Sequence, residues 1–215
     1  LDELPRVDAA QKHGFIAADM NAHAALRAQV EAVANASAVN ILVNNSGGPP
    51  GGSAHAAALD DFRIAFNQHL IAAQIILQAI LPGMQASGYG RIINVISTSV
   101  KEPIRNLGVS NTVRGAVASW AKTLATELGS HGITVNNVLP GYTRTQRLDQ
   151  ILADRSKASG NSEQQVAEAM LATVPARRFA EAAEIASAIA FLASPAAGYI
   201  NGINLPVDGG RTASL

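Results

Sequence analysis

The chain has 215 residues, 48% of them hydrophobic and 15% charged, which is enough apolar sequence to bury one large core. Sixteen basic and sixteen acidic residues give zero net charge, so no basic excess points to nucleic acid or to an anionic membrane. Cysteine is absent, which excludes disulfides, thiol nucleophiles and thiolate metal sites. The five histidines lack ligand spacing and no apolar run approaches ~20 residues. We therefore expect a cytoplasmic protein without a metal and without a membrane span.

Apolar runs typical of buried strands alternate along the chain with patterns typical of helices. In chain order we expect a strand at 14–19, a helix at 22–33 capped by Asn21, a strand at 39–45, a long helix within 59–88 that ends at Gly88, a strand at 90–97, a helix at 109–128, a strand at 132–141, a mobile loop with a short helix at 145–165, a helix at 180–194 and a strand at 200–210. This alternation predicts one α/β domain over 1–215, with a parallel sheet covered by helices on both faces.

Three expected strands run directly into polar or glycine-containing ends, at 44–48, 97–99 and 140–143. Parallel sheets bind ligands at the carboxyl ends of their strands, so these three ends together predict a binding site. The alternative is that strand-to-helix turns simply require Gly, Ser and Asn.

Two polar residues near the start of the helix at 109–128 need a separate explanation. Ser110 and Arg114 are one turn apart and therefore share a face of the helix. They are either part of the site, or a helix cap and a surface charge.

Four stretches carry a resemblance to a known family: "LVNNSGG", "GRIINVIS", "ITVNNVLPG" and "FLASPAAGYINGINLPVDGG". In this order and spacing they resemble the short-chain dehydrogenase/reductase family, and within it the β-ketoacyl-acyl-carrier-protein-reductase-like members. The resemblance implies a Rossmann-like doubly wound parallel sheet and NAD or NADP as cofactor. Family members open with a glycine-rich turn, TGxxxGxG, that these residues do not contain. Because 1–13 resemble the end of the family's second helix, we expect the first βαβ portion to precede this sequence.

The resemblance also implies which residues bind the cofactor. Asp19 would contact the adenine ring, the Thr143 backbone and the Thr145 hydroxyl would meet the carboxamide and the phosphates, and Arg114 would hold ribose hydroxyls or a phosphate. The implied cofactor-binding residues are Asp19, Asn44, Ser46, Gly47, Arg114, Pro140, Gly141, Thr143 and Thr145.

The implied catalytic positions depart from the family pattern. Ser97 matches the family serine, but Ser110 stands at the tyrosine position, Arg114 at the lysine position and His69 at the asparagine position, so the sequence reads SxxxR instead of YxxxK. A serine hydroxyl is a poor proton donor near pH 7, and losing general acid catalysis typically costs ~10²–10⁴ in rate. His69, with an ordinary histidine pKa of ~6.5, and Tyr142 are the candidate replacements.

Two functions remain open at this point. The first is an oxidoreductase that interconverts a small-molecule ketone and a secondary alcohol with an altered Tyr/Lys pair. The second is a cofactor-binding protein with weak or no turnover, acting as a regulatory or scaffold subunit. The resemblance implies a homodimer or homotetramer built on the helices at 62–88 and 110–128. The small residues expected to allow their close approach are Ala72, Ala73, Ala79, Ala116, Ala118 and Ala121.

Overall fold

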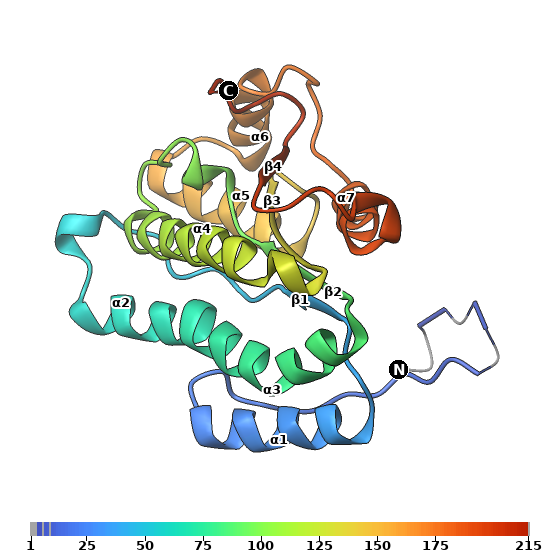
Figure 1. Ribbon diagram of the computed structural model, residues 1–215. Coiled ribbons are helices and arrows are strands. Elements are labelled where there is room, and N and C mark those ends of the chain that lie inside the picture. The colour runs from blue at the N-terminus through green and yellow to red at the C-terminus, as the bar shows by residue number, and fades with distance from the viewer. Residues whose placement is uncertain (1–3, 6, 9, 215) are drawn as a thin grey trace.

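The computed structural model describes residues 4–5, 7–8 and 10–214, and its centre is a parallel sheet (Figure 1). The strands are β1 (Ile41–Asn44), β2 (Gly90–Val95), β3 (Ile133–Pro140) and β4 (Asn204–Val207), hydrogen-bonded in that order. Every pair is parallel. The central strands β2 and β3 are buried along almost their whole length, whereas β1 is an edge strand with exposed side chains. The predicted α/β fold is confirmed.

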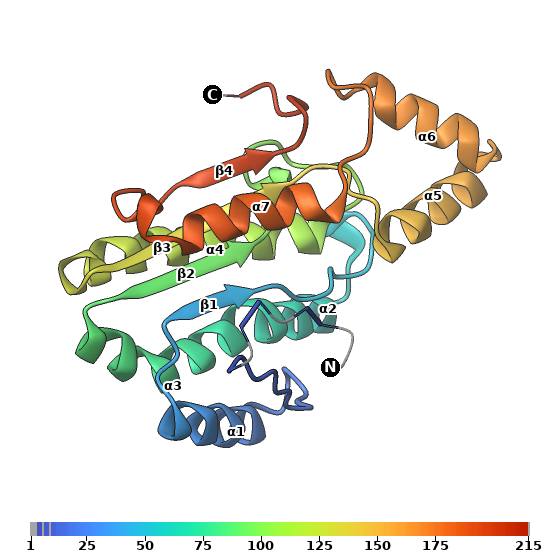
Figure 2. The same ribbon diagram turned by 90° about the vertical axis from the view of Figure 1, so that its right-hand side faces the viewer.

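Helices cover both faces of this sheet, as expected for parallel strands. The helices are α1 (His23–Ala36), α2 (Leu59–Phe66), α3 (Ala72–Ser87), α4 (Gly108–Leu128), α5 (Gln146–Ser159), α6 (Glu163–Ala172) and α7 (Ala182–Ala193). Adjacent residues of β2 point to opposite faces: Ile92 packs in the core beneath α3 and α4, and Ile93 packs against α7. Figure 2 shows α7 on the opposite side of the sheet from α3, with α5 and α6 beyond the tips of the strands.

The long helix predicted within 59–88 is present but contains a π-helical turn at Asn67–Ile71, which joins α2 to α3. It ends at Gly88, which takes the left-handed conformation with φ of 63°. By length and composition alone, Leu59–Ser87 could cross a bilayer. Leu77, Ile80 and Met84 are nevertheless buried in the core with residues of the sheet, which is how a core helix of a globular fold packs.

Four asparagines, one from each strand, form a ladder across the sheet. The strand register aligns Asn44, Asn94, Asn137 and Asn204 side by side. The Nδ2 group of Asn44 donates to Asn94 at 2.8 Å, that of Asn94 to Asn137 at 2.9 Å, and that of Asn137 to Asn204 at 2.8 Å. Asn94 and Asn137 are almost fully buried, so these bonds satisfy side-chain amides that water cannot reach.

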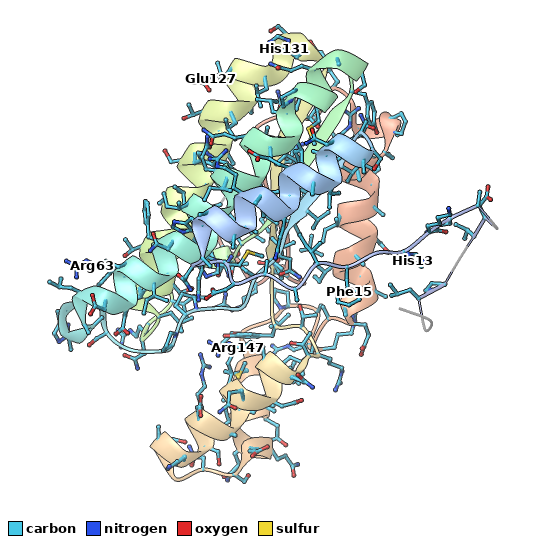
Figure 3. All side chains as sticks on the ribbon, turned by 90° about the horizontal axis from the view of Figure 1, so that it is seen from below. His13, Phe15, Arg63, Glu127, His131 and Arg147 are labelled. Carbon is cyan, nitrogen blue, oxygen red and sulfur yellow. The ribbon has the colours of Figure 1, made fainter. Side chains whose placement is uncertain are left out.

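The strand expected at 14–19 is wrong. This segment has no regular structure, and it pairs with none of the four strands of the sheet. Phe15, on the extended N-terminal segment in Figure 3, is 78% exposed. Apolar residues alone do not make a strand, because its backbone groups also need a partner ladder. The prediction that Asn21 caps this helix is also wrong, because Ala22 is the cap residue of α1. The backbone N–H of Asn21 instead donates to the Asp19 carboxylate at 2.8 Å.

Two further expectations need correction. The stretch at 145–165 is mostly helical, because α5 and α6 share an apolar cluster that includes Leu148, Val166 and Met170. Most alanines expected at an oligomer interface are used inside the chain. Ala72, Ala73, Ala118 and Ala121 are each at most 8% exposed, so they cannot form a contact surface for a second copy. The oligomer itself stays a prediction.

Candidate functional site

A cavity of about 660 Å³ lies at the carboxyl ends of β1, β2 and β3. The loop after β1 and the start of α4 form part of its wall, α7 lines another side, and α5 contributes Leu148 and Ile151. Residues from all three polar strand ends, 44–48, 97–99 and 140–143, therefore line the same cavity. Of the residues predicted for the site, those that line the cavity are Ser46, Gly47, Ser97, Ser110, Arg114, Pro140, Gly141, Thr143 and Thr145.

Ser97 lies just beyond the end of β2 and is held by a local turn. Its Oγ accepts a hydrogen bond from the backbone N–H of Ser99 at 3.1 Å, at the start of the short helix Thr98–Val100. This bond uses an oxygen lone pair, so the hydroxyl hydrogen remains able to donate into the cavity.

Ser110 and Arg114 face the cavity from the first turns of α4. Ser110 does not cap the helix, because the residue at the cap position is Leu107, which makes no side-chain cap bond. Arg114 is only 8% exposed, and its Nη1 donates to the carbonyl oxygen of Val95 at 3.1 Å. Burial lowers the pKa of Arg114 to about 10, so the side chain remains a cation at neutral pH. Ser110 is therefore not a helix cap, and Arg114 is not a surface charge.

His69 lies behind the cavity on the π-helical turn and is 5% exposed. Its Nδ1 is hydrogen-bonded to Ser46 Oγ at 2.7 Å, and its Nε2 is buried without a partner. Burial, and then the positive charge of Arg114, lower the pKa of His69 to about 4. The expectation that its ordinary pKa of ~6.5 suits a proton donor is wrong, because a pKa of about 4 leaves almost no protonated imidazole at pH 7.

Two predicted cofactor residues do not line the cavity. The Asn44 side chain lies within the asparagine ladder, and its neighbour Asn45 takes the place on the cavity wall. Asp19 lies on the segment before α1, where its carboxylate accepts the Asn21 amide.

Tyr142 and Arg147 also line the cavity. The Tyr142 ring packs edge-on against Phe179 with centroids 6.3 Å apart, and the Arg211 guanidinium lies 4.8 Å from its centroid. The sequence offers Tyr142 only as a candidate donor. It does not point to Arg147, because the polar composition of 145–165 favours a loop; the helical spacing of Leu148, Ile151 and Leu152 is the signal that could have found it.

Comparisons with known proteins agree with this arrangement. A family described as "Enoyl-(Acyl carrier protein) reductase" matches residues 2–212. The NADPH-dependent reductase BacG of Bacillus subtilis is 30% identical over 177 residues, which cover 82% of this chain and 68% of that protein. The 3-oxoacyl-[acyl-carrier-protein] reductase FabG of Vibrio cholerae is 39% identical over 174 residues, covering 80% and 66%. The chain thus spans about two thirds of the length of these curated relatives.

Solved structures show the same fold. L-sorbose reductase from Gluconobacter frateurii, complexed with NADPH and L-sorbose, superimposes with a TM-score of 0.85 at 30% identity, covering 93% of this chain and 76% of that one. The crystal structure of YwfH, an NADPH-dependent reductase of bacilysin biosynthesis, gives a TM-score of 0.84 at 28% identity, covering 93% and 78%.

Proposed function

Because the chain belongs to the short-chain dehydrogenase/reductase family, we propose that it is a nicotinamide-dependent oxidoreductase that interconverts a ketone and a secondary alcohol, with Ser110 and Arg114 in place of the family's Tyr and Lys. One observation carries the proposal. Ser97, Ser110 and the buried cation Arg114 meet in one large cavity at the carboxyl ends of the strands. That is where an open α/β sheet binds its ligand.

The cavity residues fit an anionic dinucleotide, NAD or NADP. Two arginines line the cavity, and no Asp or Glu is among the described lining residues. Gly141 brings the wall close to the last strand, since a Cβ there would lie 2.6 Å from the Cα of Asp208. At Gly47 an added Cβ would meet no atom within 4 Å, so the backbone borders open space. Gly47, Gly141, Thr143 and Thr145 would hold the cofactor, which when bound supplies or accepts the hydride.

The side chains of the cavity divide the remaining work. Ser97 donates its hydroxyl hydrogen to the substrate oxygen, because its oxygen is already engaged with the Ser99 amide. Arg114 stays charged and holds hydroxyl or phosphate oxygens with its remaining N–H groups. We propose that Tyr142, which is one of the residues lining the cavity, supplies the proton that Ser110 and the neutral His69 cannot.

A specific observation favours a second candidate, a cofactor-binding protein with little turnover. Neither group at the family's proton-transfer positions is suited to move a proton, because Ser110 is an unactivated hydroxyl and Arg114 keeps its proton. Such a protein would bind the dinucleotide and act as a regulatory or scaffold subunit.

Titration of NADPH and NADH, followed by nicotinamide fluorescence, tests the binding that both candidates require. A panel of ketones, followed by cofactor absorbance, then separates them. We expect Tyr142→Phe to lower turnover by ~10²–10⁴ and Ser110→Ala to leave it within a few-fold. Absence of turnover in the starting protein, with activity gained by Ser110→Tyr combined with Arg114→Lys, would favour the second candidate. Equal turnover in Tyr142→Phe would remove Tyr142 as the donor.

A further inference from the structure

Arg147 is a cavity residue whose charge the described protein leaves without a carboxylate. Its Nη2 donates to the carbonyl oxygen of Pro49 at 3.3 Å, and its guanidinium lies beside Gly48, where an added Cβ would be 3.7 Å away. Figure 3 shows Arg147 where the α5–α6 pair meets the rest of the molecule. The side chain thus reaches across from α5 to the loop after β1, at the cavity wall.

Two other arginines on this side of the molecule, Arg144 and Arg178, are paired with acids. Arg144 contacts Glu181 at 3.0 Å, and Arg178 forms two bonds of 2.6 Å to Glu184. In the described residues no carboxylate lies within 4.0 Å of Arg147 or of Arg114. Acidic residues are therefore available nearby, but none neutralises the two cations that line the cavity.

The position of Arg147 within its helix also favours an anionic ligand. It is the second residue of α5, where the unpaired backbone N–H groups already carry partial positive charge. A cation there is unfavourable by itself, and Asp149 lies in the same first turn but forms no ion pair with Arg147 in the described residues. The independent observation is Arg114, a cation on the same cavity that is only 8% exposed and donates to the neutral carbonyl of Val95.

We propose that Arg147 is an anion-binding residue of this cavity, and that it acts with Arg114 on a phosphate or carboxylate carried by the ligand. The inference rests on the proposed function in taking the cavity as the ligand site. Two sources offer this chemistry, the diphosphate of the dinucleotide and a carboxylate on a short oxo-acid substrate. Arginine suits both, because its planar fork presents paired N–H donors to two oxygens.

The test compares Arg147→Gln with Arg155→Gln, a matched change of an exposed arginine on the same helix. In the first arm, calorimetry at fixed ionic strength measures the binding of inorganic diphosphate, which needs no recognition of the nucleotide. In the second arm, with NADPH present, the binding of acetoacetate is compared with that of its uncharged methyl ester.

We expect Arg147→Gln to weaken at least one anion by about tenfold or more, as removal of a charge-assisted hydrogen bond does, while Arg155→Gln stays within twofold of the starting protein. A loss for diphosphate assigns the cofactor as the source, and a loss for acetoacetate but not for its ester assigns the substrate. Arg147→Lys should recover part of the affinity. Equal binding of both anions by Arg147→Gln and Arg155→Gln would overturn the inference. Failure of NADPH binding alone would instead count against the proposed function, and the diphosphate arm would still decide the role of Arg147.

Discussion

The Asn94→Ala substitution should destabilise the whole fold, because it breaks the asparagine ladder in its middle. Asn94 is 1% exposed, and its side chain takes part in two hydrogen bonds, accepting from Asn44 at 2.8 Å and donating to Asn137 at 2.9 Å. Alanine removes both bonds and leaves an amide donor on one neighbouring strand and a carbonyl acceptor on the other without their partner.

The size of the effect follows from burial. Each buried polar group left unsatisfied costs about 1–3 kcal/mol. Asn137 is buried and bears the full cost, whereas Asn44 is half-buried on the edge strand and water can replace part of its lost bond. Adding the small void left by the amide, we expect the free energy of unfolding to fall by about 3 kcal/mol.

Urea unfolding measured by circular dichroism provides the assay, with midpoints compared at equal slope. Asn40→Ala is the matched control, because the Asn40 amide also donates two bonds, to Ser87 Oγ at 2.7 Å and to the Tyr89 carbonyl at 3.1 Å, but nearer the surface. We expect this control to cost below about 1 kcal/mol. Equal losses in the two variants would refute the reasoning that burial of the ladder sets its contribution.

Two other perturbations test the packing around the site. The pKa of His69 is about 4 in the folded chain against an ordinary 6.5, so below pH 6.5 the unfolded chain takes up the proton first. The free energy of unfolding therefore keeps its full value above pH 6.5 and falls by up to about 3 kcal/mol as the pH falls towards 4. His69→Gln should remove this part of the pH dependence, measured by urea unfolding at a series of pH values across that range. An unchanged pH dependence would contradict the burial of His69. Gly108→Ala should destabilise by about 1–3 kcal/mol, since a Cβ there would clash with the backbone of Ala54. Gly115→Ala on the same helix meets no atom within 4 Å and should stabilise by up to about 1 kcal/mol. Thermal denaturation of the pair decides this, and shifts of the same sign would count against the close contact between α4 and Ala54.

Much of the fold and part of the site could be predicted because they depend on local patterns. The spacing of Val113, Val117, Leu124 and Leu128 predicts α4, and that register carries Ser110 and Arg114 to one face. Strand ends meet at one edge of any parallel sheet, so the position of the cavity followed from the alternation of elements.

The remainder depends on contacts between distant segments. A periodic pattern does not tell whether the small face of a helix meets its own core or a second chain, which is why Ala73 and Ala118, expected on a contact surface, are instead buried inside the chain. Nor does an apolar run reveal whether it pairs with the strands of the sheet, as 14–19 demonstrates. The shift in the pKa of His69 arises from burial and from Arg114, 45 positions along the chain, so no local rule could supply it.

The π-helical turn at Asn67–Ile71 lets one continuous helix serve two different partners. Each residue of an α-helix rotates the next side chain by about 100°, so the extra residue accommodated by a wider turn re-phases everything after it. Before the turn, Phe62 and Ala65 pack against the start of α4; after it, Leu77 and Met84 face the sheet. Deleting a single residue here would rotate the apolar residues before the turn relative to those after it. The helix could then keep its contact with α4 or its contact with the sheet, but not both. In an alignment of relatives, the length of this segment should therefore vary less than the identity of its residues.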